Sequence, residues 1–582
     1  MRGNGSIGKL GLLVCALTLS LNSGCGPGGP GRDAAADAIY FGGRILTMND
    51  AQPEVESVAL KDGKIFALGA RPEMEKLHKG RKTRMIDLAG KVLLPGFFDA
   101  HSHFSQVGLQ AISANLLPPP DGPVKSIAQL QAALTEHMRT SPAVKQYGIV
   151  IGFDYDDSQL AERRSPTRQE LDAVSTDSPV LIIHQSGHLG VYNSKALAMA
   201  GITAETPNPE GGVILREADG KTPNGVLEEN AHFAALLKLL PKFTPEQGME
   251  LIEAAQNIYL ANGFTTAQEG RADPSTLGLL SLAANAGKLK LDVVVYPDIT
   301  MNANNPALHG PYMSRNYVHG LRFGGVKLTL DGSPQGKTAW FTKPYFHVPA
   351  GQPDSYRGYP VMTDEQATKW VEEAYKNNWQ VLVHANGDAA IDQFLKAVRD
   401  ASGEFPRNDR RTVLIHGQFL RANQVAEIKK LGIFPALYPM HTFYWGDWHR
   451  QSVVGPERAE NLSPTGWLYA NGIKFTIHSD APVTFPNSMR VLASAVNRTT
   501  RTGYVLGPSQ RLEPLVALKA MTIWAAYQHF EEATKGSIEL GKVADLVILS
   551  DDPITVRRTQ LSEIKVMETI KNGKSVYRLT GN

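Results

Sequence analysis

Six side chains that are able to bind metal ions or transfer protons stand in short apolar runs spread along the chain. They are His101, His103, Lys327, His384, His416 and Asp480. Imidazole and carboxylate groups are ligands of Zn²⁺ and its neighbours, and a catalytic site of such an ion keeps one position open for water. These residue types therefore favour a metal site that works on water.

The positions of these residues matter more than their types. A single histidine at a strand end is more often a structural hydrogen-bonding group than a ligand, and a single strand lysine can lie at an exposed edge or pair with a carboxylate. His101 and His103 are two residues apart, so an extended strand projects both to the same side. The six residues stand in five apolar runs. If these runs are strands of one sheet, their ends lie close together, and one shared metal site explains the six residues better than six independent coincidences do.

The middle of the chain alternates apolar strands with helical stretches, which is the pattern of a parallel α/β sheet. Eight strands are expected, at 93–103, 263–269, 291–297, 324–332, 380–386, 412–417, 433–439 and 473–480. Eight such strands close a (β/α)₈ TIM barrel, in which the chemistry lies at the carboxyl ends of the strands. The first connection is too long for one helix and has its own strand-like run at 180–185. We therefore expect an inserted α/β subdomain at about 105–250, over the barrel mouth.

Both chain ends have a different character, with short apolar runs separated by turns. Residues 38–93 contain the pair Asp62-Gly63 between two apolar runs, which is typical of a hairpin, and residues 536–580 continue in the same way. The prediction is a small β-sandwich domain formed by both ends. The barrel, at 94–535, is then inserted between its two halves.

Composition excludes several classes of protein. Hydrophobic residues make up 42% and charged residues 20% of the 582 residues, which is globular composition. Lys and Arg number 59 against 57 Asp and Glu, so there is no broad basic field for nucleic acid. Both cysteines, Cys15 and Cys25, lie in the first 25 residues, which excludes a disulfide, a thiolate metal site or a cysteine nucleophile within the body. A homodimer is left open.

The first residues are typical of an export signal. Arg2 and Lys9 precede an apolar run at 10–21, which is shorter than the roughly 20 residues that span a bilayer. Ser23-Gly24-Cys25 resembles a bacterial lipobox, which implies a lipoprotein signal at 1–24, a lipid anchor on Cys25 and a flexible tether at 25–37. We expect a cell-envelope lipoprotein that meets the membrane only through this anchor. The alternative is an ordinary signal peptide and a periplasmic or secreted protein.

From about residue 37 to the end, the sequence resembles the amidohydrolase superfamily, and within it the amidohydrolase family 3 branch of N-substituted formamide deformylase-like metal-dependent hydrolases. The motifs that carry the resemblance are the run 90–103, Val326-Lys327-Leu328 with Asp331-Gly332-Ser333, His384 with Gly387-Asp388, Leu414-Ile415-His416, Ser479-Asp480-Ala481-Pro482 and the closing run 536–546.

The resemblance implies a role for each of the six residues. Two divalent ions, expected to be Zn²⁺, are bound by His101 and His103 and by His384 and His416, and Lys327 bridges them as an N6-carboxylated lysine. Asp480 binds the first ion and takes the proton of the attacking water. Metal coordination lowers the pKa of water from about 16 to about 7, so hydroxide is available at neutral pH. Asp480 then returns the proton to the leaving amine.

Three further residues bear on the site. His478 stands where the family usually has a small residue; a hydrogen-bonding position beside the ligands is favoured, with an extra ligand or proton shuttle as the alternative. His188 matches a family segment on the insertion, and the sequence leaves open whether it contacts substrate or is structural. Lys337 stands where relatives often have arginine.

The function expected from this resemblance is hydrolysis of non-peptide carbon–nitrogen bonds in a small-molecule amide, formamide or N-acyl compound. A cyclic amidase or ring deaminase of the same superfamily is the alternative. A metal-binding regulatory protein on a retired scaffold is a third hypothesis, from another class. Because a retired scaffold is expected to lose ligands and this chain keeps all six, the sequence favours an enzyme.

Overall fold

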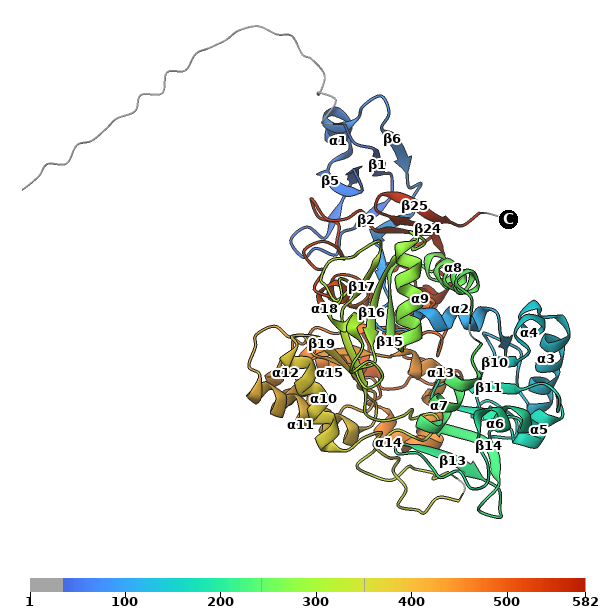
Figure 1. Cartoon of the computed structure of the whole chain (residues 1–582). Helices are drawn as coiled ribbons and strands as arrows, with labels where there is room; N and C mark the ends of the chain where they lie inside the picture. The colour runs from blue at the N-terminus through green and yellow to red at the C-terminus, as the bar shows by residue number, and fades with distance from the viewer. Residues whose placement is uncertain (1–34, 242, 350, 581–582) are drawn as a thin grey trace, which may run out of the picture.

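The computed structural model describes residues 35–580 apart from 242 and 350. Figure 1 shows a mixed α/β molecule, with strands from both chain ends at one end, helices and strands of the central part below them, and an insertion at one side. The expected signal at 1–24 and most of the tether at 25–37 lie outside the described residues. Within the described part of the chain, no helix combines the length and the apolar character that crossing a bilayer requires.

The central strands form two arcs of parallel strands. The first arc runs in the order β8, β15, β16, β17, and the second in the order β18, β19, β20, β21, β22. Their bounds are β8 Phe97–Phe98, β15 Phe264–Ala272, β16 Asp292–Pro297, β17 Leu321–Phe323, β18 Gly325–Thr329, β19 Gln380–Ala385, β20 Val413–His416, β21 Phe434–Leu437 and β22 Thr476–Ile477.

The arcs approach each other at both ends. Only Gly324 separates β17 from β18, and Asp298 forms a parallel bridge with Lys327. At the other junction the backbone N–H of Asp480 donates to the His101 carbonyl at 3.1 Å. The mixed α/β class agrees with the sequence-based expectation, whereas closure of the two arcs into one barrel stays a prediction.

The expected single strand over 93–103 is wrong. Val92–Pro95 forms β7, which pairs with strands of the end domain, and only Phe97–Phe98 (β8) pairs with the central strand β15. An uninterrupted apolar run hides this division, because each half is buried in a different sheet. As a consequence, His101 and His103 follow the strand in a connecting segment and are held there by tertiary contacts.

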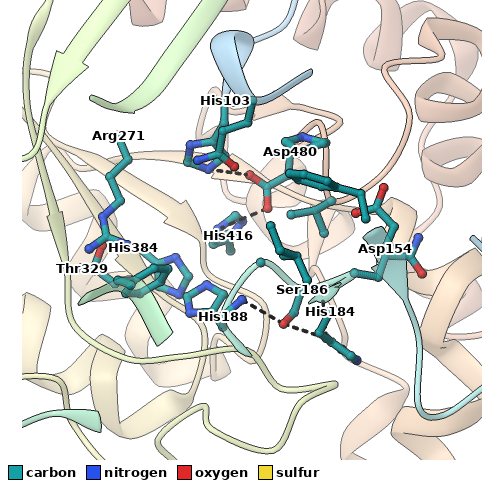
Figure 2. A pocket seen from close by; sticks show the side chains of 18 of the residues that line it. His103, Asp154, His184, Ser186, His188, Arg271, Thr329, His384, His416 and Asp480 are labelled. Carbon is teal, nitrogen blue, oxygen red and sulfur yellow. Dashed lines mark hydrogen bonds and ion pairs between the residues drawn. The ribbon is translucent and has the colours of Figure 1, made fainter. Parts of the chain in front are cut away.

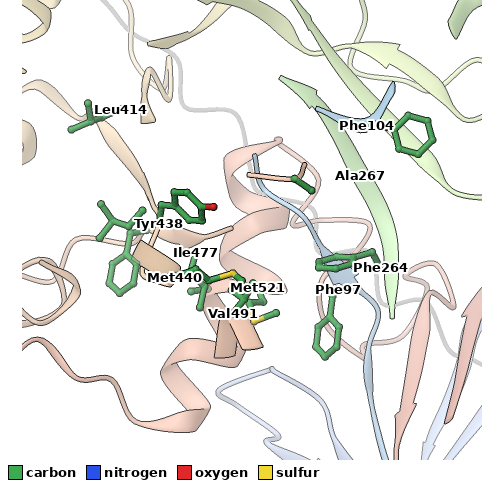
Figure 3. Packing of buried hydrophobic residues seen from close by; sticks show 14 of the residues in the cluster. Phe97, Phe104, Phe264, Ala267, Leu414, Tyr438, Met440, Ile477, Val491 and Met521 are labelled. Carbon is green, nitrogen blue, oxygen red and sulfur yellow. The ribbon is translucent and has the colours of Figure 1, made fainter. Parts of the chain in front are cut away.

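Helices cover the arcs and enclose the main apolar core. They include α8 Pro245–Ala261, α9 Pro274–Asn285, α10 Asp364–Lys376, α11 Asp388–Glu404, α12 Ala422–Leu431 and α16 Ser488–Asn497. Helices α8 and α10 begin with capping boxes, at Thr244 and Thr363, which satisfy backbone N–H groups of the first turn. Figure 3 shows Phe97, Phe264, Leu414 and Ile477, from strands of both arcs, within this one buried cluster.

The insertion has its own sheet, in the order β13, β14, β12, β11, β10, β9. The strands are β9 Ala114–Asn115, β10 Val150–Tyr155, β11 Val180–His184, β12 Leu189–Tyr192, β13 Gly212–Arg216 and β14 Pro223–Glu229, with helices such as α3 Ile127–Thr140, α6 Ser194–Ala200 and α7 Asn230–Leu239. Two separate apolar clusters contain alternating residues of these strands, one with Val180 and Ile182 and the other with Leu181 and Ile183. The alternation places one cluster on each face of the sheet.

Two sheets at the chain ends share a further core. One has the order β5, β4, β1, β6, and the other β25, β24, β23, β7, β2, β3. Their strands are β1 Ala38–Phe41, β2 Arg44–Leu46, β3 Glu54–Val55, β4 Ser57–Lys61, β5 Lys64–Gly69, β6 Arg84–Asp87, β7 Val92–Pro95, β23 Leu546–Leu549, β24 Val566–Lys571 and β25 Lys574–Arg578. Tyr40, Leu60, Leu93, Ile548 and Ile570 lie in one cluster, so both chain ends contribute to it.

Candidate metal centre

His101, His103 and Asp480 form the most compact part of the site. Their ligand atoms all lie within 4.8 Å of one another. The Nε2 atoms of His101 and His103 lie 3.5 Å and 3.6 Å from Oδ1 of Asp480. These three side chains therefore offer ligand atoms to one shared ion.

The other three sequence-predicted residues lie beside them. Lys327, in β18, places Nζ 3.1 Å from His101 Nε2, and His416 Nε2 lies 3.8 Å from Oδ2 of Asp480. The ring of His384 is 4.7 Å from the His416 ring, centroid to centroid. Figure 2 shows His103, His384, His416 and Asp480 around one cavity. The structure thus brings all six residues together from strands, and from segments that follow strands, that are far apart in the sequence.

The buried polar atoms of this group suit a cation. Nδ1 of His103, Nδ1 of His416 and Oδ1 of Asp480 are buried and make no hydrogen bond to any described residue. Buried polar atoms are normally satisfied, so this cluster calls for a partner that the protein does not supply. Burial also holds the pKa values of His101, His103, His384 and His416 well below the usual range. Neutral imidazoles keep the lone pair that a metal ligand needs.

Burial acts on the two charged members of the group in opposite directions. It lowers the pKa of Lys327 to about 7, against the attraction of Asp480. It raises the pKa of Asp480 well above its usual range, a shift that the Lys327 ammonium opposes. A lysine with this pKa is partly a neutral amine at neutral pH, and the neutral amine is the form able to react with CO₂.

Two of the six residues adopt backbone conformations that are uncommon outside glycine. His416 has φ of +71° and Asp480 has φ of +55°. Such left-handed conformations carry strain that the surrounding structure must hold, and they gather at functional sites. At Asp480 the hydrogen bond to the His101 carbonyl supplies part of that restraint.

Strand β15 contributes residues that sequence reasoning missed. The side-chain amide of Gln268 donates to the Ala100 carbonyl at 2.6 Å, so its oxygen faces Nδ1 of His101, also at 2.6 Å. This arrangement places the proton of His101 on Nδ1 and turns the Nε2 lone pair toward Lys327 and Asp480. Gly270 packs against the same ring, since a Cβ there would lie 2.4 Å from Cε1 of His101. The only sequence signal was the position of these residues at the end of an expected strand.

His188 reaches the cavity from the insertion. Its Nδ1 lies 2.8 Å from Oε2 of Glu229, whose other oxygen accepts a hydrogen bond from Thr338 at 2.6 Å. The His188 ring lines the cavity, 4.9 Å from the His384 ring. Glu229 is fully buried and has φ of +49°, a further strained position near the cavity. Of the two alternatives that the sequence left open for His188, the structure favours contact with the cavity.

His478 lies behind the ligands. Its ring stacks on Tyr438, with centroids 5.0 Å apart, and lies 5.3 Å from the His101 ring. It is buried and does not line the cavity, and neither of its ring nitrogens has a hydrogen-bond partner among the described residues. The structure therefore gives His478 ring-packing contacts beside the candidate ligands and not the hydrogen-bonding position that the sequence favoured.

In a second group of potential ligands, Asp156, Asp157 and His184, each side chain already has a polar contact within the protein. His184 Nδ1 accepts the backbone N–H of Ser186 at 3.0 Å, and its Nε2 lies 3.1 Å from Asp157. Asp156 accepts from the indole N–H of Trp445 at 2.8 Å. We interpret the group as a brace between the insertion and α13 (Met440–Trp448).

The cavity beside these residues is narrow and open to solvent. It has a volume of about 60 Å³ and lies between the candidate ligand residues and the 183–188 segment of the insertion. The ligand-type residues lie on one wall, and polar residues of the insertion, including Asp154, Ser186 and His188, lie on the other.

Comparison with known proteins agrees with this chemistry. The amidohydrolase family model Amidohydro_3 matches residues 84–577, which is most of the chain. The chain belongs to the amidohydrolase family. The resemblance recognised from the strand-end motifs is thereby confirmed.

Relatives at low identity span nearly the whole chain. The putative amidohydrolase YtcJ of Bacillus subtilis is 29% identical over 93% of this chain and 99% of its own length. The N-substituted formamide deformylase of Arthrobacter pascens is 26% identical over 94% and 99%. A shorter match, 27% identical over 62% of this chain and 77% of the relative, is the exoenzymes regulatory protein AepA of Pectobacterium carotovorum.

A solved structure supports the same assignment. An uncharacterized metal-dependent hydrolase from Pyrococcus horikoshii aligns with a TM-score of 0.70 and 25% identity, over 90% of this chain and 99% of that one. Together with family membership, this neighbour supports a metal-dependent hydrolase.

Proposed function

We propose that this chain hydrolyses non-peptide carbon–nitrogen bonds in small amides, formamides or N-acyl compounds. The observation that carries the proposal is the convergence of six ligand-type side chains, three of them with unsatisfied buried atoms, beside one solvent-open cavity that five of them line. The name of one relative, an N-substituted formamide deformylase, supports the amide class.

The residues present fit two divalent ions. His101, His103 and Asp480 would hold one ion and His384 and His416 the other, with carboxylated Lys327 between them. Nitrogen and oxygen donors of this kind suit Zn²⁺. When bound, such ions lower the pKa of water to about 7 and polarise a carbonyl group.

Asp480 is the group that we assign to proton transfer. Its carboxylate takes a proton from the attacking water, whose oxygen forms the new bond to the carbonyl carbon. The same proton is then delivered to the nitrogen as the carbon–nitrogen bond breaks, because an unprotonated amide nitrogen leaves reluctantly. The products are a carboxylic acid and an amine. His188, held by Glu229, lies on the opposite wall, where it is positioned to contact the bound substrate.

Closure of the two arcs into a (β/α)₈ barrel is part of this proposal. It is supported by the bridge between Asp298 and Lys327 and by the bonds that join 480–481 to 101–103. In a barrel, the carboxyl ends of all strands face one mouth, which is where the six residues gather.

The proposal is tested with purified, metal-loaded protein and a panel of N-formyl, N-acetyl and cyclic amides. We expect turnover of open-chain amides, with metal content measured alongside. Turnover of cyclic substrates or of ring amines alone would favour the cyclic amidase or deaminase. No turnover of any compound by metal-loaded protein would favour the regulatory alternative, to which the name of one relative lends support.

Export and lipid anchoring remain proposals that rest on residues 1–37. If Cys25 is the lipidated first residue of the mature protein, Cys25→Ser abolishes incorporation of labelled fatty acid and leaves the protein unprocessed or soluble. Fractionation and lipid labelling in a bacterial host would measure this. Unchanged labelling of the variant would end the idea, and Cys15→Ser serves as the matched control.

A further inference from the structure

Arg271 stands between the metal-centre cavity and a second cavity. It lies near the end of β15 and lines both, together with Thr329. The second cavity has a volume of about 190 Å³ and is open to solvent, and its walls include Val361, Met362 and Trp370. Figure 2 shows the Arg271 side chain reaching toward the Thr329 side of the metal-centre cavity. A substrate bound at the metal centre and extending outward in this direction would pass the guanidinium.

The guanidinium is held in place through one edge. Its Nε donates to Oδ2 of Asp298 at 2.9 Å, and the other oxygen of that carboxylate accepts the N–H of Thr300 at 2.9 Å. The Arg271 Cζ also lies 4.2 Å from the centre of the Phe233 ring, in a cation–π contact. Both contacts fix the plane of the group before any ligand binds.

The outer edge of the guanidinium, formed by its two Nη nitrogens, is free to donate hydrogen bonds to a ligand. The two Nη nitrogens of Arg271 make no hydrogen bond to any described residue, and 17% of the side chain is exposed. The hydroxyl of Thr329, on the same shared wall, likewise has no hydrogen-bond partner in the described part of the chain. Paired N–H groups of a fixed guanidinium match the two oxygens of a carboxylate.

We propose that Arg271 binds a carboxylate carried by the substrate. The preferred substrate is then an N-acylated amino acid or a similar N-acyl acid, with its amide at the metal centre and its carboxylate at Arg271. The inference rests on the proposed function and narrows it. Lys337 is a weaker candidate for this task, because its ammonium donates to the His347 carbonyl and to Ser452, both at 2.8 Å, and it lines neither cavity.

The test compares two substrates that differ only in the charged group, N-formylleucine (both enantiomers) and its decarboxylated analogue N-formyl-3-methylbutylamine. For the metal-loaded protein we expect kcat/KM to be at least about 10-fold higher for the acid, the size of effect that one charge-assisted hydrogen bond gives. Arg271→Met should abolish this preference, Arg271→Lys should keep part of it, and Lys337→Met should leave it unchanged.

A second measurement separates failure of this inference from failure of the proposed function. Calorimetry in the Asp480→Asn background, where turnover is slow, reports binding of each compound. Arg271-dependent binding of the acid, even without hydrolysis, supports the carboxylate site. Equal kcat/KM for both compounds in the parent protein overturns the carboxylate site and leaves the proposed hydrolase function intact. An equal fall of kcat/KM for both substrates in Arg271→Met, together with a lowered Tm, also overturns the carboxylate site. Arg271 would then serve only to hold Asp298.

Discussion

Replacing Asp480 by asparagine is expected to lower kcat by at least about 100-fold, the low end of the effect of general acid–base catalysis. The variant keeps the shape of the side chain and an oxygen that can bind metal, but it loses the group that accepts and returns the proton. Because the lost interaction belongs to the chemical step, KM should change much less than kcat. Steady-state kinetics with metal analysis of the same preparation measures this.

Two controls make the Asp480 result interpretable. Asp157→Asn removes a carboxylate near the cavity that lies outside the proposed proton path, and it should keep most of the activity. Thermal unfolding should show that Asp480→Asn is folded. Near-normal kcat of Asp480→Asn with its metal in place would overturn the assignment of proton transfer to this residue.

Replacing Lys327 by alanine is expected to remove metal and activity together. The lysine is buried, and burial lowers its pKa to about 7, so the neutral amine needed for carboxylation is available. A bare ammonium beside two divalent ions would be strongly disfavoured. Alanine removes the proposed bridge and leaves a space, and short carboxylic acids such as acetate or propionate should restore part of both metal binding and kcat.

The matched control for this variant is Lys337→Ala, which removes an ammonium outside the cavity and should retain its metal. Full metal content and normal kcat in Lys327→Ala would refute the bridging role. So would a high-resolution map of the metal-loaded protein with an ordered, unmodified Lys327 ammonium.

The sequence singled out six candidate ligand residues because they recur at the ends of successive apolar runs. The structure brings these six side chains together: five line one cavity, and His101 lies beside it, in contact with Lys327. Their role as metal ligands stays a prediction. Gln268 gave no comparable signal, although it orients His101, because a polar residue at a strand end has many structural explanations.

The substrate side of the cavity was much less predictable. His188 and Glu229 are 41 residues apart within the insertion, and Thr338 lies a further 109 along the chain. The contact of Glu229 with Thr338 exists only after the insertion has folded against the central part of the chain. Arg271 gave no sequence signal either, because its significance depends on which cavities it borders. The division of the first apolar run between β7 and β8 was missed for the same kind of reason, as tertiary packing decides it.

The central claim, a metal-dependent amide hydrolase with two ions per chain, is tested most directly by a metal titration. The protein is stripped with a chelator and then titrated with Zn²⁺, and hydrolysis of its best amide substrate is followed. Activity should be absent from the stripped protein and should rise to a maximum at about two equivalents per chain, the number that this donor set is expected to hold. Full activity at one equivalent would contradict the two-ion form of the account, and hydrolysis that persists without metal would contradict the account itself.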